Sequence, residues 1–182
     1  MTHINTLIRC LLVFCLALSL AYAQEDKTSD LKKDYPATLN FNGTEWKIDY
    51  ADKNDIMLIV EYVTGNESVQ KWTKLFTYQQ LLHKLPPKIT PKQFAENIEA
   101  QIKKMNIEAR FNYLESSDSE AIFEFQVLKP ADQQQDEIQR IILGKDREFY
   151  VLHYVEKKTD MGDAARKQWL ENLKNFDVPL KK

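Results

Sequence analysis

The sequence predicts an α+β domain in which helices pack on an antiparallel sheet, and three observations lead to this class. Four strand-like segments follow one another in the second half of the chain with only short turns between them, which is typical of an antiparallel meander. Helix-like segments with a single apolar stripe stand before and after that run. Only the stretch between the second and third strands is long enough for a crossover. We therefore expect about six strands, in the order β-β-α-α-β-β-β-β-α.

Residues 1–23 have the three-part layout of a secretory signal peptide. A short polar start carrying Arg9 precedes an apolar run from Leu11 to Leu20, and Ala21-Tyr22-Ala23 places small residues at the −3 and −1 positions. No later stretch approaches the about 20 apolar residues that a transmembrane helix needs. We expect cleavage after Ala23, export to the periplasm or the extracellular medium, and no transmembrane anchor in the mature chain.

Both cysteines, Cys10 and Cys15, lie inside the signal segment, so the mature chain is expected to be cysteine-free. Phe14 stands where a lipoprotein carries a small residue before its acylated cysteine, which favours cleavage over lipid anchoring. Disulfides, a thiolate nucleophile and a Cys-ligated zinc site are then not expected. The 25 Lys and Arg residues nearly balance the 27 Asp and Glu residues, so no nucleic acid partner is expected.

Residues 24–39 predict a flexible leader and residues 40–178 a single folded domain. The leader begins with the charged run QEDKTSDLKKD, which contains too few apolar residues to pack. Within the domain, Thr44–Tyr50 alternates apolar and charged residues as a half-buried strand does. Ile56–Val63 carries apolar residues at both odd and even positions, which is typical of a central strand that is covered on both faces.

Two helices are predicted to follow. The first begins at Ser68, which is placed to cap it, and ends before Pro86-Pro87. Its apolar stripe comprises Val69, Trp72, Leu75, Phe76 and Leu82. The second helix begins at Thr90-Pro91-Lys92-Gln93, which combines a capping residue, a proline at the first helical position and a glutamine at the third, and it runs to about Met105.

Four further strands and a last helix complete the predicted domain. The strands lie at about residues 107–114, 121–128, 137–143 and 148–155, and the turn sequences SSDS, KPADQQQ and GKD separate them. The helix covers about residues 160–175, with Ala165, Trp169, Leu173 and Phe176 along one side. The alternative architecture is a small barrel closed by helices.

The segment around the second strand also carries a resemblance. Glu61-Tyr62-Val63-Thr64-Gly65-Asn66-Glu67-Ser68 is followed by Trp72-Thr73-Lys74-Leu75-Phe76-Thr77-Tyr78-Gln79, with Trp46 before it and Gly144 and Tyr150 after it. This segment resembles the EYVPxGExxxxWTxMxTxQ-like segment of a group of uncharacterised exported bacterial proteins, with Thr64 for the common proline and Leu75 for the common methionine. The element order over about residues 40–176 is similar to that of PsbP, the extrinsic photosystem protein, and of DcrB-like envelope proteins. That likeness implies a PsbP-like fold and carries no ligand or role with it.

No catalytic or metal-binding motif stands out in the chain. GxSxG, HExxH and glycine-rich phosphate loops are absent, and no metal site or cofactor is expected. His83 and His153 are the histidines of the mature chain. We expect His83 to be exposed near the end of its helix, and His153 to be a hydrogen-bonded sheet residue on a face shared with Phe149, Val151 and Val155.

Two glutamates and one loop are the candidates for a site. Glu61 and Glu124 interrupt apolar strands, and each should face water or meet a cation such as Arg110, Arg140 or Arg147, because a buried carboxylate is costly unless it is paired. The candidate binding residues are Glu61, Asn66, Glu67, Trp72 and Thr73, where a central strand leaves the sheet. The structural alternative for this segment is a helix start with its cap and a core tryptophan.

The sequence therefore predicts an exported, non-enzymatic binding or envelope-associated domain that acts on an unknown protein or small ligand. One alternative is a secreted protein that binds a component of a host or of a competing organism. The other is a carboxylate-dependent hydrolase, with Glu61 and Glu124 as its first candidate residues. A concave pocket with converging polar groups would favour an enzyme, whereas an exposed apolar patch would favour a binding module.

Overall fold

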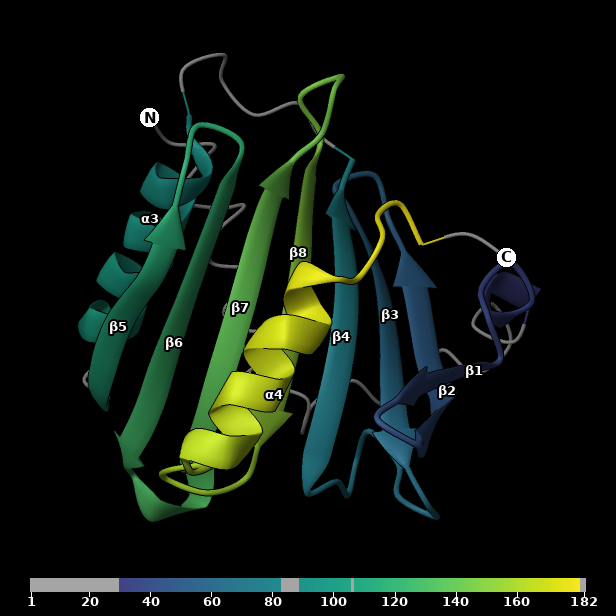
Figure 1. The fold of residues 1–182 in the computed structure, drawn as a ribbon, viewed down its shortest axis with the longest axis horizontal. Coiled ribbons are helices and arrows are strands. Elements are labelled where there is room, and N and C mark those ends of the chain that lie inside the picture. The colour runs from purple at the N-terminus through teal and green to yellow at the C-terminus, as the bar shows by residue number, and fades with distance from the viewer. Residues whose placement is uncertain (1–29, 83–88, 106, 181–182) are drawn as a thin grey trace.

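The computed structural model describes residues 30–82, 89–105 and 107–180 (Figure 1). The expected signal peptide and its cleavage site, together with His83 and Pro86-Pro87, lie outside these residues. Within them, one sheet carries helix α4 across one face and helix α3 on the other, behind strand β5 in Figure 1. None of the described helices is long and apolar enough to cross a membrane.

The sheet has eight antiparallel strands, so the expected count of about six and the expected element order are wrong. The strands are β1 (Thr38–Phe41), β2 (Thr44–Lys53), β3 (Met57–Thr64), β4 (Lys74–Leu81), β5 (Glu108–Ser116), β6 (Glu120–Lys129), β7 (Gln135–Leu143) and β8 (Phe149–Glu156). The helices that follow β1 in the chain are α3 (Pro91–Lys104), the 3₁₀-helix η1 (Ala131–Gln133) and α4 (Asp163–Lys174), and residues 30–32 before β1 are also helical. The sheet order β1-β2-β3-β4-β8-β7-β6-β5 leaves an open sheet with β1 and β5 at its edges, not a barrel. The α+β class is compatible with this arrangement, whereas the PsbP-like element order is not.

The helix expected from Ser68 is a turn followed by strand β4, and this is the main correction to the expected order. β4 lies in the middle of the sheet between β3 and β8, and its residues Leu75, Phe76, Thr77 and Tyr78 are all buried. A short segment with apolar residues at both odd and even positions also fits the spacing of an apolar helix face. Periodicity alone therefore does not distinguish a strand from a helix here. Burial on both faces of the sheet is what selects the strand.

The first hairpin was not expected either. β1 begins at Thr38, inside the segment expected to be a leader, and pairs with β2 through Leu39↔Trp46 and Phe41↔Thr44. Asn42 and Gly43 connect the strands with φ values of 54° and 79°. Positive φ at both positions is the requirement of the commonest two-residue hairpin turn, and Asn-Gly is its strongest sequence signal.

The second half of the chain has the expected meander. β5, β6, β7 and β8 pair in sequence, and Gly144 begins the turn between the last two. The capping box of α3 is also confirmed: Thr90 Oγ1 accepts a hydrogen bond from the Gln93 backbone N–H at 3.2 Å, and the Thr90 N–H donates to Gln93 Oε1 at 3.1 Å. α3 packs on β5, β6 and β7 through Phe94, Ile98 and Ile102.

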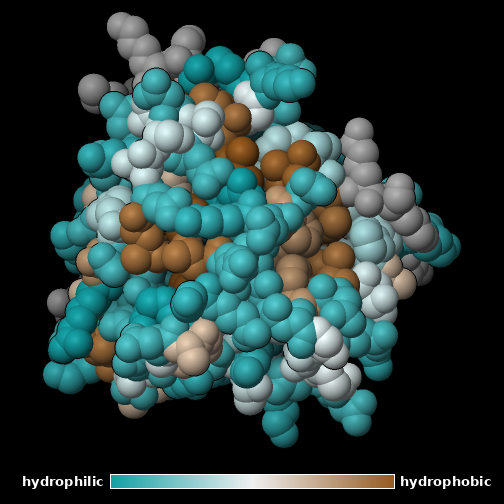
Figure 2. Space-filling view, viewed as in Figure 1, coloured by the Kyte–Doolittle hydropathy of each residue, from teal (hydrophilic) through white to brown (hydrophobic). Residues whose placement is uncertain are grey.

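Each face of the sheet has its own core. Alternation along β8 sends Phe149 and Val151 into the cluster beneath α3, which we call the α3 face, and Tyr154 into the cluster beneath α4, the α4 face. On the α4 face, the Trp169 ring stacks on Tyr154 with ring centroids 3.7 Å apart. Figure 2 shows this face, where hydrophilic side chains cross the surface between hydrophobic areas. On the α3 face, α3 covers the β5 side, and the strands near β4 carry polar residues instead.

Candidate functional site

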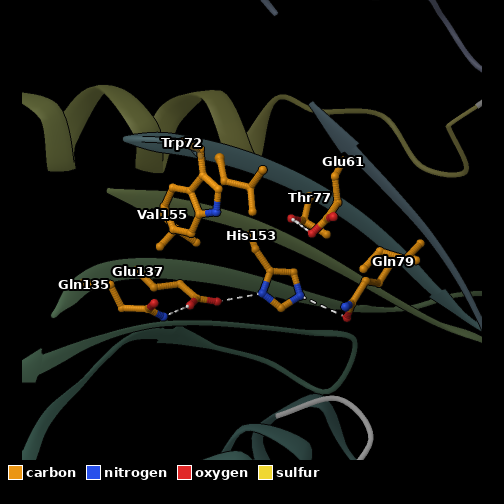
Figure 3. A pocket seen from close by; sticks show the side chains of 10 residues that line it. Glu61, Trp72, Thr77, Gln79, Gln135, Glu137, His153 and Val155 are labelled. Carbon is orange, nitrogen blue, oxygen red and sulfur yellow. Dashed lines mark hydrogen bonds and ion pairs between the residues drawn. The ribbon is translucent and has the colours of Figure 1, made fainter. Parts of the chain in front are cut away.

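Four neighbouring strands place polar side chains side by side on the α3 face. The register pairs Glu61 with Thr77, Thr77 with His153, and His153 with Gln139, so one row crosses β3, β4, β8 and β7. All four side chains are buried, and Glu61 is only 2% exposed. Buried polar groups need hydrogen-bond partners. The partners found in this row define the site, which we call the His153 pocket (Figure 3).

Glu137 is the acceptor at one end of the His153 pocket. Its two carboxylate oxygens accept hydrogen bonds from Gln135 Nε2 at 2.9 Å and Gln139 Nε2 at 2.6 Å, and Oε1 also lies 2.7 Å from His153 Nδ1. Three neighbouring side chains therefore occupy the two oxygens of this carboxylate. Glu137 therefore fixes the orientation of the imidazole and has its hydrogen-bonding capacity largely filled.

Gln79 faces the other nitrogen of the imidazole. Its Oε1 lies 3.1 Å from His153 Nε2, while its Nε2 has no hydrogen-bond partner among the described residues. An acceptor oxygen thus faces each ring nitrogen. With a neutral ring, the Gln79 amide would turn and donate from Nε2. The amide then presents its oxygen to the rest of the pocket.

Glu61 is the group of the pocket with the most perturbed acidity. Burial raises the pKa of Glu61 to about 8, which the hydrogen bond from Thr77 opposes and the Asp49 carboxylate reinforces. Thr77 Oγ1 lies 3.5 Å from Glu61 Oε1, and Glu61 Oε2 has no hydrogen-bond partner among the described residues. The expected arginine partner is not there, because Arg140 pairs with Glu120 and Arg147 donates to the Ile89 carbonyl.

A cavity of about 10 Å³ lies between these side chains, and Trp72 forms one wall of it. Its lining also includes Glu61, Gln79, Glu137 and His153. This volume accommodates a single group the size of a water molecule. Trp72 is 7% exposed, and Lys157 Nζ lies 4.5 Å from the centroid of its ring.

The five candidate binding residues do not form one cluster around this cavity. Glu61 and Trp72 line it, whereas Asn66, Glu67 and Thr73 do not. Thr73 Oγ1 donates to Glu67 Oε1 at 2.5 Å, and the Glu67 N–H donates to the Thr64 carbonyl, so these residues hold the turn between β3 and β4. His153 is confirmed as a hydrogen-bonded sheet residue.

Sequence reasoning missed the glutamines and Glu137 of the pocket. Thr77 and Gln79 alternate along β4, and Gln135, Glu137 and Gln139 alternate along β7. A period of two is the signal of one face of a strand. It could not be used for β4 while that segment was interpreted as a helix.

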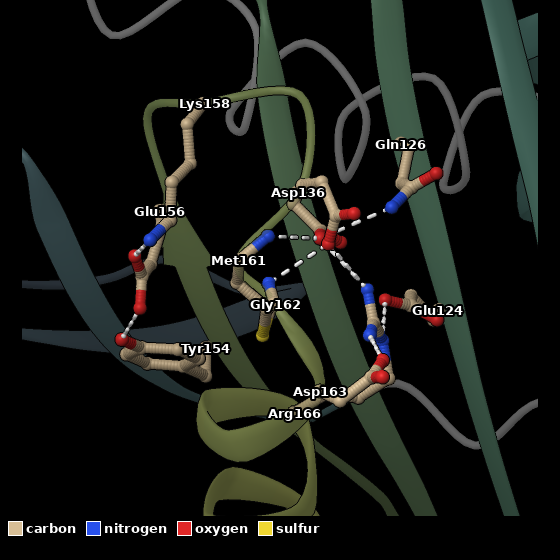
Figure 4. Close-up of polar contacts among 11 residues, drawn as sticks. Glu124, Gln126, Asp136, Tyr154, Glu156, Lys158, Met161, Gly162, Asp163 and Arg166 are labelled. Atoms are coloured by element: carbon tan, nitrogen blue, oxygen red, sulfur yellow. Dashed lines mark hydrogen bonds and ion pairs between the residues drawn. The ribbon is translucent and has the colours of Figure 1, made fainter.

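Glu124 lies on the opposite face of the sheet, in a cluster around Arg166 of α4 (Figure 4). Arg166 Nε lies 2.5 Å from Glu124 Oε1, and its terminal nitrogens lie 2.8 Å from Asp160 and from Asp163. Glu124 thus meets a cation as expected, but the partner is Arg166 and none of the three arginines considered. Because Glu61 and Glu124 lie on opposite faces, they cannot act together on one bond, which corrects the carboxylate-pair hypothesis.

Asp136 joins the Arg166 cluster from β7. Its Oδ2 accepts hydrogen bonds from the Met161 backbone N–H at 2.7 Å and from Gln126 Nε2 at 3.2 Å, and it lies 3.5 Å from Arg166. Burial raises the pKa of Asp136 to about 6, and the Glu124 carboxylate adds to the rise. This cluster ties the start of α4 to β6 and β7, and among the described residues no group of side chains could hold a metal ion.

Comparison with known proteins gives a match at the level of a family. A family model matches residues 34–179, which include every described strand and helices α3 and α4, and the function of that family is uncharacterised. No curated protein matches the chain. The site must therefore be interpreted from its own geometry.

Proposed function

The chain belongs to this uncharacterised family, and we propose that it is an exported, non-enzymatic binding domain whose site is the His153 pocket. The observation that carries the proposal is that Glu61 Oε2 and the Gln79 amide atom that points away from His153, Nε2 in the orientation described, belong to residues lining one cavity and have no partner among the described residues. A buried polar atom without a partner costs about 1–3 kcal/mol. Two such atoms at one cavity indicate a place where a ligand supplies the missing partners.

The resemblance to exported bacterial proteins supports the same site. Four positions of the EYVPxGExxxxWTxMxTxQ-like segment correspond to Glu61, Trp72, Thr77 and Gln79 of this chain, and all four line the cavity. The segment joins β3 to β4, so the turn between these strands brings its two halves to one face of the sheet. Export itself is supported by the layout of residues 1–23.

The geometry of the cavity favours binding of one small group over catalysis. Pockets for drug-sized ligands or substrates usually enclose about 300–1,000 Å³, whereas this cavity has about 10 Å³ and so holds a single small group. The residues that line the cavity include no serine or cysteine, the Thr77 hydroxyl is directed at Glu61 Oε1, and both His153 nitrogens already face Glu137 and Gln79. Docking of a host or competitor protein is less favoured, because a docking surface usually exposes a patch of apolar side chains. In the described part of the chain, the only exposed large apolar residues are Met105 and Tyr113.

Two measurements test the proposal. Intact-mass analysis of the exported protein should show a chain that begins at Gln24, and a species that keeps Cys15 with an attached lipid would contradict soluble export. Purified wild type and Glu61→Gln would then be exposed to extracts of the envelope and of the culture fluid. A compound retained by the wild type and by the exposed-site control Glu45→Gln, but not by Glu61→Gln, is the expected result. Equal retention by all three proteins would overturn the assignment of the site.

A further inference from the structure

We infer, building on the proposed binding function, that the His153 pocket takes a primary ammonium group carried by a small alkylamine or by a lysine side chain. The inference rests on a juxtaposition in the structure: the Glu61 carboxyl and the Trp72 ring are walls of the same small cavity. A carboxyl beside an aromatic face is a combination that attracts an ammonium group.

Charge decides which sign of ligand the pocket accepts. Glu61 is buried and forms no ion pair with a described residue, although a buried carboxylate is costly unless a cation meets it. Glu137 is already held by Gln135, Gln139 and His153, so it needs no further donor. An anionic ligand would face both carboxyls, whereas an ammonium group gives Glu61 Oε2 a donor, and beside a neutral His153 the turned Gln79 amide offers its oxygen as a second acceptor.

Size decides between the possible cations. A cavity of about 10 Å³ has room for a group like one water molecule, and –NH₃⁺ is such a group. A planar guanidinium or a quaternary ammonium is larger than this cavity. The indole already contacts an ammonium group, because Lys157 Nζ lies 4.5 Å from its ring centroid.

Binding of an ammonium group should release a proton from Glu61, and this release can be measured. Below about pH 8 Glu61 carries a proton, and an ammonium ligand favours its ionised form, so binding near neutral pH releases about one proton to solvent. The titratable groups that face Glu61 are Asp49 and Tyr50 of β2, with Glu137 of β7 and His153 of β8 on the same cavity. Affinity should therefore rise about tenfold per pH unit between about pH 6 and pH 8 and then level off.

The test is calorimetric titration of the full mature chain with methylammonium chloride at constant ionic strength, in buffers of different ionisation enthalpy. We expect saturable binding with release of about one proton per ligand at pH 7. Tetramethylammonium, potassium and methanol, which differ in size, hydrogen bonding or charge, should not bind. A peptide with one lysine separates the two sources: tighter binding of the peptide assigns a protein side chain as the natural group, and weaker binding assigns a free amine.

Two variants keep the test interpretable. Glu61→Gln preserves the shape of the side chain and should abolish proton release and weaken binding at least tenfold, while Glu45→Gln should behave as wild type. Trp72→Phe keeps an aromatic wall and should retain weaker binding, so it serves if Glu61→Gln does not fold. Binding of tetramethylammonium or potassium as tight as that of methylammonium, or binding without proton release, would overturn the inference. The proposed binding function would then be tested separately, by the retention experiment with extracts.

Discussion

His153 and Glu137 form a diagonal pair across two neighbouring strands: His153 Nδ1 lies 2.7 Å from Glu137 Oε1, although the register places His153 opposite Gln139 and Glu137 opposite Val155. The diagonal leaves Glu137 in reach of donors from its own strand, Gln135 and Gln139. One carboxylate therefore organises three side chains in a buried environment.

Replacement of Glu137 by alanine is expected to cost about 3–5 kcal/mol of unfolding free energy, because it leaves three buried donors without their acceptor. Urea denaturation followed by circular dichroism measures the loss. The matched control is Glu108→Ala at the exposed edge strand β5, where the ion pair with Lys129 is open to solvent and the cost should be below about 1 kcal/mol. Equal losses in the two variants would contradict the role of Glu137.

Trp72→Ala is expected to cost about 3–5 kcal/mol, as truncation of a buried aromatic side chain does. The indole is 7% exposed and packs with Val63, Val69, Leu75 and Val155. Thermal unfolding of wild type, Trp72→Ala and Trp72→Phe gives the comparison, and the phenylalanine variant should lose less. A melting temperature of Trp72→Ala equal to that of the wild type would contradict a core position for this residue.

The stability of the protein should fall as pH rises from about 4.5 to about 8, in part because of Glu61. Its pKa is raised from 4.5 to about 8 by burial, so in this window the folded chain keeps a proton that the unfolded chain loses. The contribution is present below the lower value, decreases by about 1.4 kcal/mol per pH unit, and is lost above the higher value.

The Glu61→Gln variant isolates this contribution. Urea unfolding at a series of pH values should show a smaller pH dependence for the variant than for the wild type. Asp136 contributes with the same sign but over a lower window, because its pKa is raised from 3.8 to about 6. Because Asp136 is unchanged in the variant, its contribution cancels in the difference between the two proteins, and an equal pH dependence of both between about pH 5 and pH 8 would contradict the burial of Glu61.

Arg166→Met should cost about 3–5 kcal/mol, because Glu124 and Asp136 would stay buried without their cation. The neighbouring Lys167 is exposed on the same helix, and Lys167→Met should change the unfolding free energy by less than about 0.5 kcal/mol. Chemical denaturation of both variants measures the difference. If Arg166→Met is as stable as Lys167→Met, the cluster does not anchor α4.

The meander β5–β8 and helix α3 were predictable because their signals are local. Turn residues separate the strands, and Thr90 with Gln93 forms a capping box that the sequence alone displays. β4 was not predictable by the same means, since its residues are buried on both faces and a short continuous apolar run fits either period. Only the pairing with β3 and β8 settles the conformation of that run.

The site was predictable in part for the same reason. Glu61 and Trp72 could be selected because a carboxylate in an apolar strand and a tryptophan after a turn are unusual in the sequence. The position of Glu137 beside His153 depends on the pairing of β7 with β8 and on a diagonal contact. Neither the residue types nor their spacing in the sequence predicts that contact. The partner of Glu124, Arg166, was missed for the same reason, because it lies on a helix distant in the sequence.

The pairing of β4 with β8 affects the order in which the chain can fold. β1–β4 form one local meander and β5–β8 form another, and in the described sheet the only strand pairing between the two halves is that of β4 with β8. The ribosome must therefore synthesise the whole second half before β4 has its second neighbour. Until then β4 is an unpaired edge rich in apolar side chains, which invites pairing between chains. Nascent or truncated chains that end before Phe149 should thus be the aggregation-prone species, and a chaperone that shields KLFTYQQL would act at that stage.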